Sequence, residues 1–148
     1  MDALYVAKII INKCYEDKID LTITKLHKLL YVIYGAYLVI KEKKLFEELP
    51  ACFRYGPIFK SVQKEYKSDN LKLDKKYNID TITCDNILDI IISKILDTFG
   101  KSSGTALSKW SHREGSAWNE AYKDDKYWGN DIKEEYIRKE FNTIIRLN

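Results

Sequence analysis

Arginine is scarce in this chain. Only four of its 25 basic residues are arginines (Arg54, Arg113, Arg138 and Arg146), and the formal net charge of +3 is spread along 148 residues. Proteins that read nucleic acid favour arginine, because its planar guanidinium makes paired hydrogen bonds to phosphates and base edges. The composition therefore argues against a dedicated nucleic-acid reader.

Cysteine is sparse as well. The three cysteines, Cys14, Cys52 and Cys84, lie far apart and form no CxxC pair or His-partnered spacing. An odd number of separated cysteines is typical of reduced thiols in a cytoplasmic protein, and not of a disulfide framework or a zinc site. We therefore expect half-buried free thiols, no metal and no cofactor.

Long apolar runs are missing too. The longest uncharged stretch, residues 29–40, is much shorter than the roughly 20 residues that cross a bilayer. Lys8 and Lys13 interrupt the N-terminal segment, which therefore differs from the apolar core of a signal peptide. The sequence predicts no membrane partner and a cytoplasmic location.

Only two histidines, His27 and His112, could serve as a general base. Neither has the neighbours of a Ser-His-Asp, Cys-His or His-Glu site. The GKS triplet at residues 100–102 lacks the first glycine and the preceding strand of a phosphate-binding loop. We expect no enzyme and no nucleotide site, and we expect His112, next to Ser111, to make structural hydrogen bonds between two helices.

What the chain does contain is helical periodicity within a length that suits one domain, residues 1–148. The pattern predicts a mainly α-helical domain around a central apolar helix, with at most one very short strand pair near residues 51–56. The first expected helix covers residues 4–14, with Lys8, Asn12 and Lys13 on its polar face. The other expected elements are a helix from Ile23 capped by Thr22, a helix from Pro57 to about Lys67, a solvated and mobile loop at 68–80, a helix over Asn86–Phe99 closed by a left-handed Gly100, a short helix at 105–110, a helix capped by Ser116 and a last helix at 131–146.

Large aromatic side chains gather near the end of the chain. Three tryptophans, Trp110, Trp118 and Trp128, fall within 19 residues, together with Tyr122, Tyr127 and the nearby Tyr136. Such rings are enriched at the centres of protein interfaces. The helical string around Trp118 favours a core position, whereas the polar loop around Trp128 favours exposure and makes Trp128 the preferred interface residue.

Three separated motifs stand out. They are KLLY, from Lys28 to Tyr31; RYGP at residues 54–57; and Ser111 and His112 followed by Trp118. In RYGP, Gly56 permits a turn that other residues resist, and Arg54 and Tyr55 are presented at the bend.

In order and spacing these motifs resemble the SocA-like, or Panacea, domain, which also occurs in GepA-type phage-associated proteins. The resemblance spans about residues 4–122, with Phe53 where tryptophan is frequent and His27 where glutamine is commoner. It implies an antitoxin that binds a cognate toxin encoded nearby, and one branch of the family acts as an adaptor that delivers its toxin to a protease. It implies no catalytic residue and assigns Lys28, Tyr31, Gly56, Pro57, Ser111, His112 and Trp118 to the structural motifs. The candidate partner-binding residues are Arg54, Tyr55, Trp110 and Trp128, and the alternative function is a DNA-binding regulator of a phage or mobile element that uses a lysine-rich helix surface.

Overall fold

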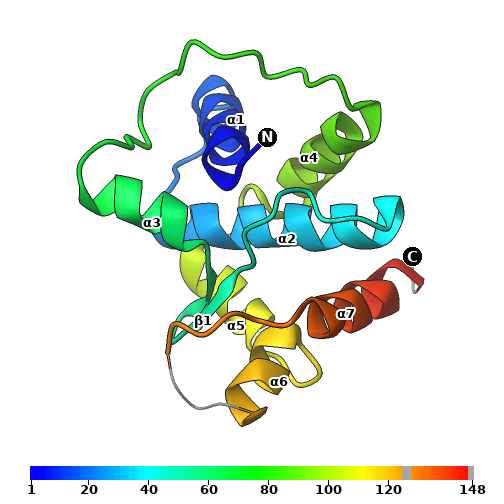
Figure 1. Cartoon of the computed structure of the whole chain (residues 1–148). Coiled ribbons are helices and arrows are strands. Elements are labelled where there is room, and N and C mark those ends of the chain that lie inside the picture. Colours follow the sequence, from blue (N-terminus) through cyan, green and yellow to red (C-terminus); the bar gives the residue numbers. More distant parts are fainter. Residues whose placement is uncertain (125–127, 147–148) are drawn as a thin grey trace.

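The computed structural model describes residues 1–124 and 128–146, and in this part the fold is mainly α-helical, as the sequence predicts (Figure 1). One short antiparallel hairpin accompanies the helices. The elements are α1 Ala3–Glu16, α2 Ile23–Lys41, β1 Ala51–Phe53, β2 Gly56–Ile58, α3 Lys60–Lys67, α4 Asn86–Phe99, α5 Gly104–Ser111, α6 Ala117–Asp124 and α7 Glu134–Arg146.

Helix α2 runs through the centre of the molecule and touches α1, α4, α5, α7 and β2 (Figure 1). Thr22 caps it as expected, because the Thr22 hydroxyl accepts a hydrogen bond from the backbone N–H of Lys25 at 3.2 Å. Within the described residues α2 is also the one helix long and apolar enough to cross a membrane, but most of it lies inside the protein. A helix apolar around most of its circumference is what a core position requires.

The hairpin replaces the helix start that was expected at Pro57. Cys52 pairs with Pro57 and Phe53 with Gly56, so Pro57 belongs to strand β2, and α3 begins only at Lys60. The expectation was wrong because a proline also fits a short edge strand, where its missing N–H costs no ladder bond. The short strand pair itself is confirmed.

The segment between α3 and α4 is irregular, as expected, and arches across one side of the molecule (Figure 1). Hydrogen bonds from Asn12 of α1 hold this segment in place. The expectation that Asn12 lies on the polar face of the first helix was wrong. Asn12 is fully buried, and its side chain donates to the carbonyl of Tyr77 at 2.9 Å and accepts from the N–H of Tyr77 at 2.6 Å. A buried side-chain amide that satisfies both backbone groups of one residue fixes the loop at that point.

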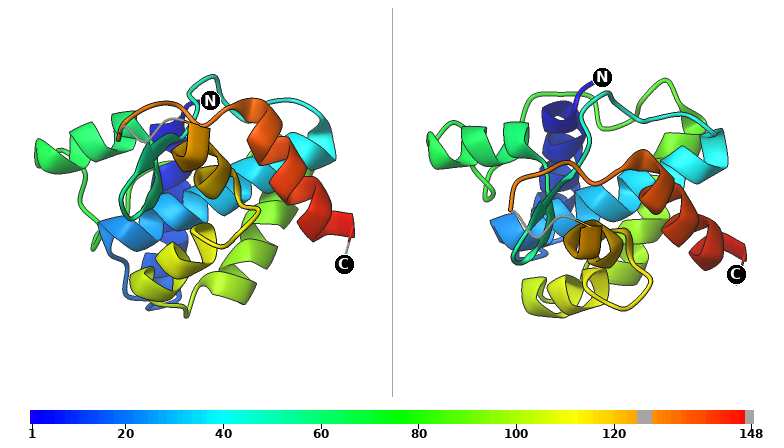
Figure 2. Two further views of the ribbon diagram at one scale, coloured as in Figure 1. Left: turned by 90° about the horizontal axis from the view of Figure 1, so that it is seen from below. Right: turned by 60° about the horizontal axis from the view of Figure 1, so that its bottom comes forward.

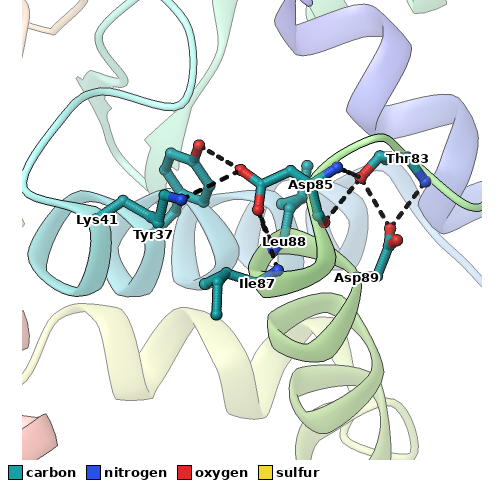
Figure 3. A network of polar contacts seen from close by, with 7 residues as sticks. All are labelled: Tyr37, Lys41, Thr83, Asp85, Ile87, Leu88 and Asp89. Carbon is teal, nitrogen blue, oxygen red and sulfur yellow. Dashed lines mark hydrogen bonds and ion pairs between the residues drawn. The ribbon is translucent and has the colours of Figure 1, made fainter.

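Helix α4 has the bounds that the sequence predicts, and a polar network holds its first turn (Figure 3). The Asp85 carboxylate accepts from the N–H groups of Ile87 and Leu88 and from the hydroxyl of Tyr37 on α2, the last at 2.7 Å. The Tyr37 hydrogen bond is the main cause that lowers the pKa of Asp85. At the other end Gly100 has a right-handed backbone, with φ −58°, so the expected left-handed cap is wrong.

The last part of the chain closes the core. Ser116 caps α6 as expected, by accepting from the N–H of Asn119, whereas α7 begins at Glu134 and not at Asp131. Asp131 instead forms a bridge with Ala51, which extends the hairpin region. Figure 2 shows α6 and α7 on the same side of α2, with α6 next to the hairpin.

The cysteines are free thiols in this structure. Cys14 and Cys52 are buried and Cys84 is exposed, so the expectation of three half-buried thiols is wrong in detail. Burial raises the pKa of the Cys14 thiol to about 11, which leaves it protonated and weakly reactive.

Candidate functional site

The three sequence motifs meet at one buried junction. Lys28, from the KLLY motif on α2, donates from Nζ to the carbonyl oxygen of Pro57 at 2.8 Å. Gly56 lies between Lys28 and Ser111, because a Cβ at this position would come within 2.5 Å of Lys28 Cε and 2.6 Å of Ser111 Oγ. Its φ of +117° also disfavours any other residue.

Lys28 is almost completely buried at this junction. Burial lowers the pKa of its ammonium from 10.5 to about 7, because the charged form loses its hydration. The neighbouring His27 is also buried. Its Nδ1 accepts from the N–H of Phe59 at 3.2 Å and its Nε2 pairs with Gln63 Oε1 at 2.8 Å, while burial lowers the pKa of His27 to about 4. His27 therefore joins the start of α3 to α2 as a neutral imidazole.

A second buried centre forms around Glu140 of α7. One carboxylate oxygen of Glu140 accepts from the Tyr31 hydroxyl and from the N–H of Ala117, and the other pairs with Arg113 at 2.7 Å. Burial and the adjacent carboxylate raise the pKa of Tyr31 well above its ordinary value, so its hydroxyl stays protonated and donates. This carboxylate links α2, α7 and the segment between α5 and α6.

Four rings form what we call the aromatic stack: His112, Trp118, Tyr122 and Trp128. The His112 and Trp118 centroids are 3.8 Å apart, Trp118 and Tyr122 5.4 Å apart, and Tyr122 and Trp128 5.2 Å apart, all at small interplanar angles. The Trp118 indole N–H donates to the carbonyl of Phe53 at 2.6 Å, which attaches the stack to the hairpin. The stack therefore runs from the interior to the surface on a rigid support.

The structure gives the tryptophans different surroundings. Trp118 is 8% exposed and Trp128 47% exposed, which agrees with the core and surface positions that the sequence favours. Trp110 packs between Phe99 and Phe141, with the Arg113 guanidinium 4.0 Å from its ring centroid. Trp110 is therefore half-buried and stands apart from the exposed end of the stack.

Arg54 and Tyr55 occupy the two-residue turn of the hairpin and are both exposed. The loop at Trp128 lies beside this hairpin, because the N–H of Gly129 donates to the carbonyl of Cys52 at 2.7 Å. The structure thus brings Trp128 into the same region as Arg54 and Tyr55, from which it is more than 70 residues away in sequence. Tyr127, also part of the predicted aromatic cluster, lies outside the described residues.

His112 does not make the helix-linking hydrogen bonds that were expected of it. Its Nε2 is buried and has no hydrogen-bond partner among the described residues, and the ring stacks on Trp118 instead. Burial, followed by the nearby Lys28, lowers the pKa of His112, so a neutral ring suits the stack. Ser111 does satisfy the helix end, because its hydroxyl donates to the carbonyl of Ser108 at 2.8 Å.

Sequence reasoning missed Glu140 and Gln63, the polar residues that complete these centres. Glu140 lies on the inward stripe of the last helix, one residue before Phe141. A charged residue on a predicted apolar stripe was the available signal.

Comparison with known proteins agrees with the three motifs. Residues 26–119 match the model of the family described as antitoxin SocA-like, Panacea domain. The chain belongs to this family. It is also 27% identical over 134 residues to Antitoxin SocA of Caulobacter vibrioides (strain NA1000 / CB15N), covering 80% of this chain and 69% of that protein. No solved structure matches the chain.

The matched region of this Panacea domain contains the whole Lys28, Gly56 and Ser111 junction and Trp118. It stops before Trp128 and before Glu140. The exposed end of the aromatic stack and the carboxylate that closes the core are thus outside the part that the family model describes.

Proposed function

We propose that this chain is an antitoxin-like module that neutralises a cognate protein toxin by direct binding in the cytoplasm. The family supports the antitoxin role in general, and the proposed partner is a toxin encoded beside its gene. The proposed contact surface consists of Arg54, Tyr55 and Trp128, and the whole chain acts as one domain.

The observation that carries this surface is the exposed Trp128 ring at the end of a stack anchored in the core. Tryptophan, tyrosine and arginine are the side chains most enriched among binding hot spots. Trp128 already rests on Tyr122, and the hairpin holds Arg54 and Tyr55 in a tight turn. Preorganised side chains lose little conformational entropy on binding, which favours a tight complex.

The test is co-expression of this chain with the protein encoded next to its gene. We expect the neighbour to stop growth when expressed alone, the chain to restore growth, and the two proteins to purify together. A neighbour that is harmless alone, or toxic but never bound, would exclude the antitoxin function. Duplex DNA binding that falls steeply with salt would favour the DNA-binding regulator instead.

The surface is tested with the variant Tyr55→Ala combined with Trp128→Ala. Each ring is expected to contribute about 1–3 kcal/mol to binding if it is a hot spot. The matched control is Tyr15→Ala, which removes a 52% exposed tyrosine from α1, away from the hairpin. Equal toxin affinity of the double variant and the control would reject this surface while leaving the antitoxin function intact. A toxin half-life that shortens when the antitoxin is present would add the role of proteolytic adaptor.

A further inference from the structure

A pocket of about 540 Å³ lies where the N-termini of α2 and α5 meet. Five aliphatic hydroxyl residues line it, Thr22, Thr24, Ser103, Thr105 and Ser108, and none of the described lining residues is acidic. The exposed ring of Tyr55 forms another part of the wall. The lining offers several hydroxyl groups and no carboxylate, and most of its exposed surface is apolar.

The two helix starts face the same space. Gly104, the first residue of α5, packs against α2 so closely that a Cβ would lie 3.2 Å from Thr22 Oγ1 and 3.4 Å from Thr24. Thr22 and Ser103 cap the N–H groups of Lys25 and Ala106. The earlier N–H groups of both helices have no partner within the described residues, and each helix start carries a partial positive charge.

Ser108 supplies an independent indication of a ligand. The residue is 8% exposed, and its hydroxyl has no hydrogen-bond partner in the part of the chain that the structure describes. A serine within a helix either points to solvent or donates to the carbonyl four residues earlier, and a buried hydroxyl without a partner is costly. As a pocket-lining residue, Ser108 can recover that cost by hydrogen bonding to a bound oxygen.

A buried lysine lies near this pocket. Thr24 and Lys28 are one turn apart on the same face of α2, and Ser108 is one turn before Ser111 on α5. Lys28 and Ser111 meet across Gly56, the residue after Tyr55. Within the described residues the Lys28 side chain has one hydrogen bond, to Pro57. Because its pKa is about 7, the amine is only partly protonated at neutral pH, and a nearby anion favours its charged form.

We propose that this pocket binds the phosphate group of a small organic phosphate. A phosphate suits this pocket because unpaired N–H groups, hydroxyls and two helix starts can all face its oxygens. Such a site differs from a phosphate-binding loop, since it needs no strand followed by a glycine-rich loop. The pocket is larger than a phosphate alone, and the Tyr55 ring offers an apolar wall for the rest of the molecule. The pocket shares Tyr55 with the proposed toxin surface. Phosphate binding is measured on this chain alone, so its failure is distinguishable from a failure of toxin binding.

The experiment is an NMR titration of the full chain at constant ionic strength and neutral pH. Inorganic phosphate, phenyl phosphate and sodium chloride are added separately, and the amide signals of Thr24, Gly104 and Thr105 are followed. We expect saturable shifts of these amides with both phosphates, tighter binding of phenyl phosphate, and no saturable shift with chloride. If neither phosphate gives saturable shifts, the proposal is wrong. If both phosphates bind with equal affinity, the claim that the pocket holds an organic group beside the phosphate is wrong.

Two variants locate the site. Ser108→Ala removes one hydrogen bond to a charged oxygen and should weaken phosphate binding about tenfold without lowering the melting temperature. Thr105→Glu places a carboxylate at the pocket edge, in a first helical turn where it suits the helix, and should abolish binding. The controls are Ser93→Ala and Ser93→Glu, which introduce the same two side chains at an exposed position of α4. Phosphate affinity that is the same in the Ser108, Thr105 and Ser93 variants would show that the phosphate binds elsewhere and would overturn the proposal.

Discussion

Glu140 allows the sharpest test of how the core is held together. Replacing it by alanine leaves the fully buried Tyr31 hydroxyl and the Ala117 N–H without an acceptor, each at a cost of about 1–3 kcal/mol. Arg113 adds little, because it is 33% exposed and can turn to water. We expect Glu140→Ala to lower the free energy of unfolding by about 3 kcal/mol, measured by urea denaturation followed by circular dichroism.

Glu140→Gln separates the hydrogen bonds from the charge. The glutamine oxygen can still accept from Tyr31 and Ala117, so the loss should be only about 1 kcal/mol. Glu135→Ala, at an exposed position of the same helix, is the matched control and should also cost less than about 1 kcal/mol. A Glu140→Ala protein within about 0.5 kcal/mol of the original would refute the role assigned to this carboxylate.

Three further outcomes are expected. Gly56→Val should cost about 1–3 kcal/mol or more of stability in a thermal melt because of its positive φ and the close Lys28, whereas Gly115→Val, with a positive φ but open space around it, should cost less. Trp118→Ala should cost roughly 3–5 kcal/mol of unfolding free energy and Trp128→Ala only about 1 kcal/mol, and the reverse order would contradict their core and surface positions. The pKa of Lys28 is about 7 in the folded chain and 10.5 in the unfolded chain, so the unfolded chain binds more protons between these values. The free energy of unfolding should therefore rise from pH 7 to pH 9 by up to about 1.4 kcal/mol per pH unit. Lys28→Met should abolish that rise.

Local patterns predicted the helices well where the sequence carried both a period and a cap. Helix α4 has the predicted bounds, and Thr22 and Ser116 cap the helices assigned to them. The failures came from contacts between distant parts of the chain. Pro57 is drawn into a strand by pairing with Cys52, and Asn12 is buried because it binds the backbone of Tyr77.

In the candidate site too, features set by the local sequence were predicted and features set by contacts between distant segments were not. The core position of Trp118 and the exposure of Trp128 followed from the residues around them. The stacking of His112 on Trp118 could not be predicted, because it depends on how α6 is oriented against the end of α5. The meeting of Thr24 with Gly104 was equally inaccessible, since two loops must first bring their helices together.

The contact between α2 and α7 has a consequence for how the protein is made. Phe141 packs directly against Gly35, and Glu140 binds Tyr31, 109 residues away along the chain. During synthesis the central helix emerges about 109 residues before its partner, and at roughly 5–20 residues per second this delay lasts several seconds. Throughout that interval the apolar face of α2 that later receives Phe141 has no cover, so a chain stalled before α7 should be a substrate for chaperones and proteases.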